Sequence, residues 1–413
     1  MKAIIITIGD ELLIGQTVDT NSAWIGAELS RIGFDICCKK TIHDDRHDIL
    51  KALGESAEMA DVVIITGGLG PTSDDITKQT LCEFFNTGLV LNREVLTMIE
   101  KMMQRRHYPV IDRTLKQAEV PESCRVLTNA AGTAPGMWFE KDNTTFISMP
   151  GVPYEMKYIM TAHVVPNLKK RFTSQVIIHK TIMTYGELEA KLAERLAGFE
   201  AALPETVKLA YLPSGGIIKL RLTGTGKSKD LLTGDLEAQV QKLRVEIPDL
   251  IFSENEEPFE MVIGRLLNER GQTVCTAESC TGGNIAHMLT SVPGSSDYYR
   301  GSVIAYDNRI KQEILNVPAD ILGKYGAVSE ETARMMAEGA RKLLKVDFAV
   351  ATTGIAGPDG GSEAKPVGTV CLGVASAEET VTRRLVFGSE RTFNITRFSI
   401  AALNMLRIQI IRQ

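Results

Sequence analysis

The residues with the clearest chemical potential lie in the last third of this 413-residue chain. An apolar stretch, Thr273–Ala277, runs into Glu278-Ser-Cys-Thr-Gly-Gly283. Ser279 is a candidate nucleophile there, and Lys311 is a candidate base, because a lysine that is buried or lies beside another cation can be neutral. Tyr306 offers a hydroxyl that can position the proton. Taken singly, a glycine-rich turn or a lysine needs only a structural explanation, so their combination carries the hypothesis.

Two details of this group stay open. Arg309 is a candidate for the cation that lowers the pKa of Lys311. Cys280, with Glu278 and Lys311, would suit a glutamate-lysine-cysteine amidase, and a thiol is intrinsically the better nucleophile near neutral pH. However, Cys280 falls in the first turn of an expected helix and is equally explained as a buried apolar thiol. We favour Ser279, and replacing each residue in turn decides between them.

A second group follows the apolar stretch Val62–Ile65. Its sequence is Thr66-Gly-Gly-Leu-Gly-Pro-Thr-Ser-Asp-Asp-Ile-Thr77, in which Gly67, Gly68 and Gly70 let the backbone approach an anionic ligand closely. No Gly-Lys-Ser/Thr follows, so it is not a P-loop. Asp74 and Asp75 are explained in part as caps of a helix at Ile76–Phe85. Capping needs only one of them, and a divalent cation that bridges phosphates would give the other a role.

Two further charged clusters favour structural explanations. His43 and His47 are four residues apart beside Asp44 and Asp45, a spacing that metal ligands can have, but solvated residues at a helix start explain them better. The basic stretch Lys101–His107 is expected to face solvent, with a phosphate contact from a neighbouring subunit as the lesser alternative.

The elements that must position these residues alternate between strand and helix. In the first part, strands are expected at Ala3–Ile8, Val62–Ile65 and Phe146–Ser148, and helices at Asn21–Ile32 and Asp48–Met59. This alternation predicts a parallel sheet covered by helices on both faces, with ligands at the carboxyl ends of the strands. The last part repeats it with four strands, at Thr273–Ala277, Val303–Tyr306, Phe348–Thr353 and Val370–Ala375.

The fold class predicted is therefore α/β: two α/β domains with mainly parallel sheets, joined by a small α+β domain. We place the domains at residues 1–170, 171–252 and 253–413. In the middle domain, Val176–Met183 and Ile217–Thr223 alternate like strands, and Glu187–Leu196 and Leu231–Val245 have helical spacing.

Composition bounds the function. With 44% hydrophobic and 23% charged residues, the chain has the profile of a globular protein, and its net charge of −5 argues against nucleic acid as the main partner. No apolar run is long enough to span a membrane, and the first residues do not resemble a signal peptide. The seven cysteines include no C-x-x-C pair, which argues against a zinc site and for reduced thiols. We therefore expect a cytoplasmic protein that does not bind membranes.

The last third closely resembles the nicotinamide-nucleotide amidohydrolase family, the C-terminal domain of CinA-like proteins, over Phe259–Arg412. The resemblance is carried by Val274–Gly283, Gly294–Ser296, Tyr306, Lys311, Gly326–Ser329, Gly354–Gly361 and Lys365–Val370. It implies hydrolysis of the carboxamide of nicotinamide mononucleotide to nicotinate mononucleotide and ammonia, with no cofactor. Ser279 would be the nucleophile and Lys311 the base, assisted by Tyr306 and Ser296. The residues expected to bind the substrate are Glu278, Thr281, Gly282, Gly283, Gly354, Ala356, Gly357 and Arg391.

The first part resembles the molybdopterin-binding domain family, in the variant found in CinA-like proteins, over about residues 1–168. Gly9–Gly15, Asp19–Asn21, the glycine-rich segment and Met149–Glu155 carry this resemblance. It implies an ADP-ribose pyrophosphatase that depends on a divalent metal (Mg, Mn or Co), with Asp44 and Asp75 as metal ligands. The residues expected to bind the nucleotide are Asp10, Asn21, Gly67, Gly68, Gly70 and Asp74.

The middle domain resembles the KH-like domain of CinA-like proteins through Thr184–Glu189. It lacks the G-x-x-G loop with which KH domains clamp RNA, so we interpret it as a spacer and oligomerisation element, and we expect a homodimer. Two alternatives remain for the whole chain. One is a molybdopterin-related ligand-binding protein, and the other is a protein associated with competence or DNA damage that has no catalytic activity.

Overall fold

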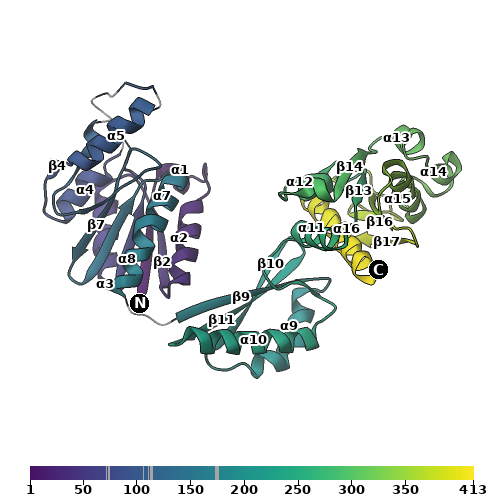
Figure 1. Cartoon of the computed structure of the whole chain (residues 1–413), viewed down its shortest axis with the longest axis horizontal. Helices are drawn as coiled ribbons and strands as arrows, with labels where there is room; N and C mark the ends of the chain where they lie inside the picture. Colours follow the sequence, from purple (N-terminus) through teal and green to yellow (C-terminus); the bar gives the residue numbers. More distant parts are fainter. Residues whose placement is uncertain (71, 73–74, 106, 110, 112–114, 173–175) are drawn as a thin grey trace. The chain divides into compact units, whose positions relative to one another are not determined.

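The structure, a computed structural model, describes residues 1–70, 72, 75–105, 107–109, 111, 115–172 and 176–413. These residues form two compact units. The first comprises residues 1–179 and 224–235, and the second comprises residues 180–223 and 236–413. Figure 1 shows the two α/β regions and the smaller middle region in chain order. None of the helices in the described ranges is long and apolar enough to cross a lipid bilayer.

The first α/β region is built on a six-stranded sheet in the order β2-β1-β3-β8-β7-β6. The first four of these are parallel neighbours, as predicted, whereas β7 and β6 continue the sheet in antiparallel pairing. The strands are β1 (Lys2–Ile8), β2 (Asp35–Ile42), β3 (Val62–Thr66), β6 (Arg125–Leu127), β7 (Gly136–Lys141) and β8 (Thr144–Met149).

Helices cover both faces of this sheet (Figure 1). Alternate residues of β1 point to opposite faces, so that Ile5 packs with one helix layer and Ile4 and Ile6 pack with the other. One layer contains α2 (Thr20–Arg31), α7 (Pro153–Ile159), the π-helical turn η2 (Met160–Val164) and α8 (Val165–Arg171), and the other contains α3 (Arg46–Met59) and α4 (Thr77–Phe84). Because both faces are buried, the carboxyl ends of the parallel strands are where a ligand can enter.

The remaining elements of this region lie outside the main sheet. A two-stranded antiparallel ribbon joins β4 (Leu89–Leu91) to β5 (Glu119–Pro121). The helical segments are α1 (Asp10–Leu13), α5 (Arg93–Arg105) and the 3-10 turn η1 (Lys116–Ala118). Val95 and Ile99 of α5 form a small apolar cluster with Ala118, which attaches this helix to η1.

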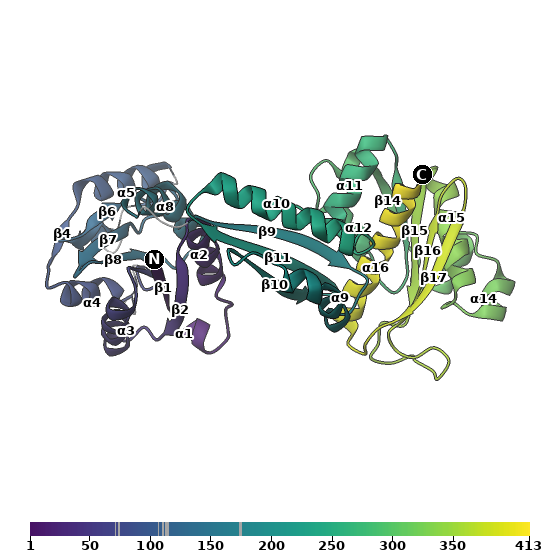
Figure 2. The same ribbon diagram turned by 90° about the horizontal axis from the view of Figure 1, so that it is seen from below.

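The middle region is a four-stranded sheet in the order β10-β11-β9-β12 with two helices (Figure 2). It contains β9 (Val176–Tyr185), α9 (Glu189–Ala201), β10 (Val207–Ser214), β11 (Ile217–Gly226), α10 (Lys229–Glu246) and β12 (Ile251–Ser253). The small α+β architecture predicted for this part is confirmed, and β10 is an additional strand that its irregular apolar pattern did not indicate.

The last α/β region has a five-stranded sheet in the order β14-β13-β15-β16-β17. Only β14, β13 and β15 are parallel, because β16 and β17 add antiparallel strands at one edge. Its strands are β13 (Val274–Glu278), β14 (Tyr299–Ile304), β15 (Phe348–Gly354), β16 (Thr369–Ala375) and β17 (Thr380–Val386). The predicted strand Val303–Tyr306 is therefore out of register, since β14 begins and ends earlier and Tyr306 follows it.

Helices again cover both faces of this sheet (Figure 2). One apolar core joins the sheet to α11 (Phe259–Arg270), α12 (Asn284–Thr290) and α16 (Arg391–Arg412), and the other joins it to α15 (Glu330–Leu344). The short elements are η3 (Ser295–Asp297), α13 (Asn308–Glu313) and α14 (Ala319–Tyr325). This packing leaves the carboxyl ends of the parallel neighbours β13 and β15 uncovered, and the predicted nucleophile Ser279 directly follows β13.

Candidate functional site

Ser279 lies in the turn between β13 and α12, directly after the carboxyl end of β13. Its backbone N–H donates to the carbonyl of Thr352 on β15 at 2.9 Å, which ties the turn to the neighbouring strand. Gly282 and Gly283 have φ values of 60° and 99°, a left-handed conformation that glycine adopts without strain, and they redirect the chain into α12. The turn therefore holds Ser279 at the open edge of the sheet.

Glu278 has a structural function in this turn. Its fully buried carboxylate accepts hydrogen bonds from five donors, the hydroxyls of Thr276 and Thr281 and the backbone N–H groups of Gly283, Ile285 and Ala286. It thus caps the amino end of α12, where unpaired N–H groups and the helix dipole favour an anion. The prediction that Glu278 binds substrate is corrected, because its carboxylate faces inward.

Lys311 meets Ser279 from α13. Its side chain is only 1% exposed, and Nζ lies 3.1 Å from Ser279 Oγ, 2.7 Å from the Ala305 carbonyl and 3.2 Å from the Tyr306 carbonyl. Burial lowers the pKa of Lys311. Among the described residues, no carboxylate lies within salt-bridge distance of Nζ. These contacts favour a neutral amine at the serine hydroxyl.

Arg309 does not contribute to this pKa shift. Its guanidinium is exposed and pairs with Asp307, the residue that caps α13, whereas desolvation is the main cause of the lowered pKa of Lys311. The hypothesis of a cationic neighbour is therefore corrected, since burial alone accounts for the direction of the shift.

Ser279 and Lys311 open into a cavity of about 310 Å³. The loop after β15 brings Gly354, Ala356 and Gly357 to its wall, as predicted for substrate-binding residues. Arg391, the first residue of α16, also lines it, and its guanidinium donates to the Gly357 carbonyl at 2.7 Å and to the Tyr306 hydroxyl at 3.2 Å. Residues 112 positions apart in sequence, from Ser279 to Arg391, thus meet around one space.

Three other lining residues were not among the predicted substrate-binding residues. Asn308 and Asp359 are exposed at this cavity, and Thr353 is buried and donates its hydroxyl to the Ala327 carbonyl. Asp359 lies in the segment Gly354–Gly361, which carries the family resemblance, but it was not singled out as a substrate-binding residue.

The backbone donors differ from those predicted. The N–H of Gly282 donates to Ser279 and that of Gly283 to Glu278, so both are occupied within the turn. The Thr281 hydroxyl is also engaged, with Glu278 and Thr352. The assignment of Thr281, Gly282 and Gly283 as ligand-binding groups is corrected accordingly. Within the described ranges, the N–H groups of Cys280 and Thr281 have no acceptor in another residue, and of these two residues only Cys280 lines the cavity.

Ser296 lies at the wrong end of the sheet to assist Ser279. It belongs to η3, immediately before β14, and β14 begins where Tyr299 pairs with Val274 at the amino end of β13. Ser279 follows the carboxyl end of the same strand. The prediction that Ser296 assists Ser279 is therefore wrong within one chain, because the two residues lie at opposite ends of β13.

Cys280 is buried, and desolvation raises the pKa of its thiol to about 12. A thiol with this pKa is protonated at neutral pH and is a poor nucleophile. No hydrogen bond joins its sulfur to Lys311 in the described structure. These observations favour Ser279 over Cys280, in agreement with the preference drawn from the sequence.

The first α/β region has a hollow of about 390 Å³ at the carboxyl ends of its parallel strands. Gly67, Gly68 and Gly70 line it as predicted, together with four carboxylate side chains, those of Glu11, Asp44, Asp75 and Glu155. The N–H of Gly67 donates to Met149 and that of Gly70 to Asp75. In the described part of the loop, the N–H groups of Gly68 and Leu69 are left for a ligand.

The two acidic residues assigned to a metal both reach this hollow. Asp75 accepts from the N–H groups of Gly70 and Thr72 at 2.8 and 2.9 Å, and a Cβ at Gly70 would lie 2.5 Å from its carboxylate. A Cβ at Gly68 would lie 3.1 Å from Asp44 Oδ1. Because Gly68 and Gly70 have no Cβ, the carboxylates of Asp44 and Asp75 can lie close to the backbone of this loop. Asp74 lies outside the described residues.

Asp10 is placed differently from its prediction. It pairs with His43 at 2.8 Å, and this contact raises the pKa of His43. The neighbouring residue Glu11 lines the hollow instead, which corrects Asp10 to Glu11. Asn21 lines a smaller adjoining hollow of about 120 Å³, and its amide donates to the Gly151 carbonyl at 2.7 Å, so it also anchors that turn.

Glu155 is a fourth acidic residue of this hollow, and it was not among the predicted site residues. Its carboxylate is 8% exposed, accepts from the Asn129 amide at 2.6 Å and lines the hollow. A Cβ at Gly132 would lie 2.0 Å from it, so the glycine makes room for this buried acid. Its position on α7, directly after the Pro150-Gly151 turn that follows β8, was the available signal.

The remaining charged clusters have structural explanations. Asp45, His47 and Asp48 are the one group of three potential metal ligands found among the described residues, but Asp45 caps α3 through the N–H groups of His47 and Asp48.

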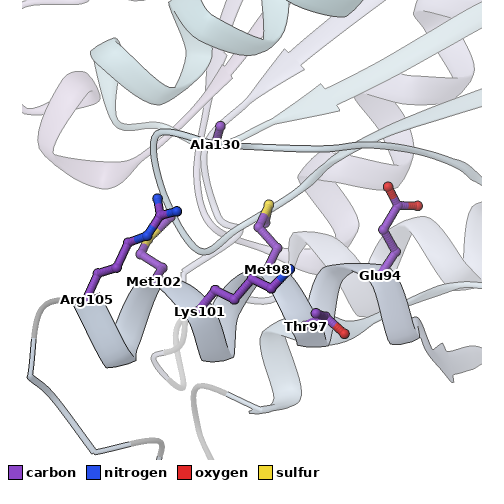
Figure 3. Close-up of a pocket in the computed structure, with 7 residues that line it drawn as sticks. All are labelled: Glu94, Thr97, Met98, Lys101, Met102, Arg105 and Ala130. Atoms are coloured by element: carbon purple, nitrogen blue, oxygen red, sulfur yellow. The ribbon is translucent and has the colours of Figure 1, made fainter.

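A wider hollow of about 630 Å³ lies along α5 (Figure 3). Glu94, Met98 and Arg105 point from the helix toward the loop that carries Ala130, and Lys101 lies on the same helix. Both cations are exposed, as expected for a solvent-facing surface. None of the motif residues lines this hollow. We therefore do not consider it a candidate site, although it is wider than the hollows at Ser279 and at Gly67.

Comparison with known families agrees with this organisation. Residues 256–410 match the family described as the CinA C-terminal domain, residues 4–170 match the probable molybdopterin binding domain, and residues 179–253 match the damage-inducible protein CinA KH domain. These matches place the two cavities in two different families of domain.

Relatives extend over the whole chain. A CinA-like protein of Cytophaga hutchinsonii is 47% identical over 99% of this chain and 98% of its own length, and one of Flavobacterium psychrophilum is 45% identical over 100% and 99%. A crystal structure of the competence/damage inducible protein CihA from Agrobacterium tumefaciens is 38% identical, covers 38% of this chain and 99% of its own, and has a TM-score of 0.36. The chain therefore belongs to the CinA-like protein family.

Proposed function

We propose that the last domain hydrolyses the carboxamide of nicotinamide mononucleotide to nicotinate mononucleotide and ammonia. The observation that carries this proposal is the environment of Lys311 Nζ. A neutral amine has two N–H groups and one lone pair. The carbonyls of Ala305 and Tyr306 accept two N–H groups, at 2.7 and 3.2 Å, which leaves the lone pair for the Ser279 hydroxyl at 3.1 Å. This is the arrangement of a serine nucleophile with its general base.

The reaction follows from this contact. Lys311 takes the hydroxyl proton while Ser279 Oγ attacks the amide carbon, and the N–H group of Cys280, which lines the cavity, would stabilise the oxyanion that forms. Lys311 then returns the proton to the amide nitrogen, so that the carbon–nitrogen bond breaks and ammonia leaves. A water molecule, deprotonated by the same amine, then attacks the ester of Ser279, and Lys311 returns the proton to Ser279 Oγ as the ester bond breaks and the carboxylate leaves.

Arg391 would bind the phosphate of the substrate. Its guanidinium lines the cavity, and its contacts with Gly357 and Tyr306 are to neutral oxygens, so its charge is available to an anion. The Tyr306 side chain, 63% exposed, holds the guanidinium at the rim and so positions the nucleotide, not the proton.

An ammonia-release assay tests this proposal. Wild-type protein is expected to release ammonia from nicotinamide mononucleotide without an added metal, and Ser279→Ala is expected to release none. The matched control is Ser291→Ala, which changes an exposed serine at the end of α12 away from the cavity. Absence of ammonia with folded wild type would remove the proposal and favour a binding or non-enzymatic role in competence or DNA damage.

A second activity is proposed for the first domain, the hydrolysis of ADP-ribose to AMP and ribose 5-phosphate. Four carboxylates and a glycine-rich turn line one hollow, and such hard oxygen donors fit a divalent cation. Asp44 and Asp75 would hold the metal, which would polarise the pyrophosphate and activate water. The N–H groups of Gly68 and Leu69 would bind phosphate oxygens. Production of AMP from ADP-ribose tests this role, and binding of a pterin without AMP formation would favour the molybdopterin-related alternative.

A further inference from the structure

The cavity at Ser279 carries two opposite charges that have no ion-pair partner among the described residues. Arg391 contacts only the Gly357 carbonyl and the Tyr306 hydroxyl, and among the described residues no carboxylate lies within salt-bridge distance of it. Asp359 lines the same cavity from the loop after β15, and in the described structure it forms no ion pair or hydrogen bond. The two side chains line one space without neutralising each other.

The rest of the lining does not supply compensating charge. Lys311 is the only other charged residue type among the cavity's described lining residues, and it is buried at the floor with its Nζ directed to Ser279 and two carbonyls. The remaining lining residues are uncharged, and polar side chains such as Asn308 and Thr353 stand beside apolar ones such as Val328 and Ile355. Charge recognition therefore falls to Asp359 and Arg391.

We infer that this cavity selects a dipolar ligand, whose cationic ring faces Asp359 and whose anionic group binds Arg391. The inference rests on the proposed function and deepens it. The pyridinium ring of nicotinamide mononucleotide carries a fixed positive charge next to the carboxamide, and its phosphate is negative. Asp359 is thus a specificity-determining residue that separates oxidised pyridine nucleotides from their reduced counterparts, whose ring is uncharged.

The reduced form of nicotinamide mononucleotide provides a matched probe. It keeps the carboxamide, the ribose and the phosphate, and the hydride added at C4 of the ring removes the positive charge. Both ligands are titrated calorimetrically against Ser279→Ala, which binds without turnover, and against the double variant Ser279→Ala, Asp359→Asn. Asp320→Asn in place of Asp359→Asn is the control, because Asp320 is an exposed carboxylate on α14 that does not line the cavity.

Loss of the carboxylate is expected to weaken binding of the oxidised ligand by about fivefold, the effect of one solvent-exposed charge pair, and to change binding of the reduced ligand by less than twofold. Asp320→Asn should change neither. An unchanged ratio of the two affinities, or an equal loss for both ligands, would overturn the inference while leaving the amidase intact. If Ser279→Ala binds neither ligand and wild type releases no ammonia, the proposed function fails together with it.

Discussion

Replacing Lys311 by methionine tests the base directly. Methionine is of similar length and suits a buried site, but it has no lone pair that can accept the Ser279 proton. A positioned general base contributes about 10²- to 10⁴-fold to the rate. The described lining of the cavity offers no histidine and no other buried base, so we expect kcat to fall by that whole factor. The assay is ammonia release over a range of pH.

The pH dependence sharpens this test. The reactive form of Lys311 is the neutral amine, and its fraction rises as the pH increases through the pKa of the folded protein. Because burial lowers that pKa from the usual 10.5, kcat/KM of wild type should rise and level off at a pH below 10.5. Residual activity of Lys311→Met should lack this limb. A variant that keeps more than a tenth of the activity, or keeps the same pH profile, would show that Lys311 is not the base.

The fold of the variant is checked by its melting temperature. Methionine removes the cost of burying an amine, but it leaves the carbonyls of Ala305 and Tyr306 without a donor, at about 1–3 kcal/mol each. These effects oppose each other, so a cooperative transition near that of wild type is expected. A collapse of the transition would assign the lost activity to misfolding, and Lys311→Arg, judged by its pH profile, would then serve as the second variant.

Three other substitutions test separate parts of the structure. Glu278→Gln should destabilise the last domain by about 3 kcal/mol in chemical denaturation. The two carboxylate oxygens of Glu278 accept from five donors, and a glutamine amide has only one acceptor oxygen. An unchanged midpoint would contradict its role as a cap. Cys280→Ala should keep most ammonia release, and the thiol should react slowly with alkylating reagents at pH 7, since its pKa is about 12; loss of activity would revive the cysteine mechanism. Asp75→Asn, or chelation of divalent metal, should abolish AMP formation from ADP-ribose and spare ammonia release; loss of both activities would contradict two independent sites.

The sequence was most informative where chemistry follows a buried strand. Ser279 and the glycines Gly67–Gly70 were placed correctly at open sheet edges, because the carboxyl ends of parallel strands are a general ligand position. The approach of Lys311 to Ser279 was implied only by resemblance, since a separation of 32 residues carries no geometry.

The errors lie in the turns. Whether Asp10 or Glu11 faces the hollow, and whether Glu278 faces the cavity or α12, depends on backbone angles of one or two residues that no periodicity reports. Ser296 was misplaced because its motif lies before β14, and the shift of that strand was not visible in its apolar pattern. Loop contacts of this kind depend on tertiary packing.

The capped amino end of α12 has a consequence for how this domain can change. Because Glu278 already occupies the positive end of that helix, the usual backbone site for a phosphate is closed, and recognition is left to side chains on the 355–360 loop and α16. In the proposed mechanism, the nucleophile Ser279 and the residues that recognise the substrate, Asp359 and Arg391, therefore lie on different segments. Randomising the loop while keeping the β13 turn should yield enzymes for other amides that inherit the same nucleophile, a modularity useful for directed evolution.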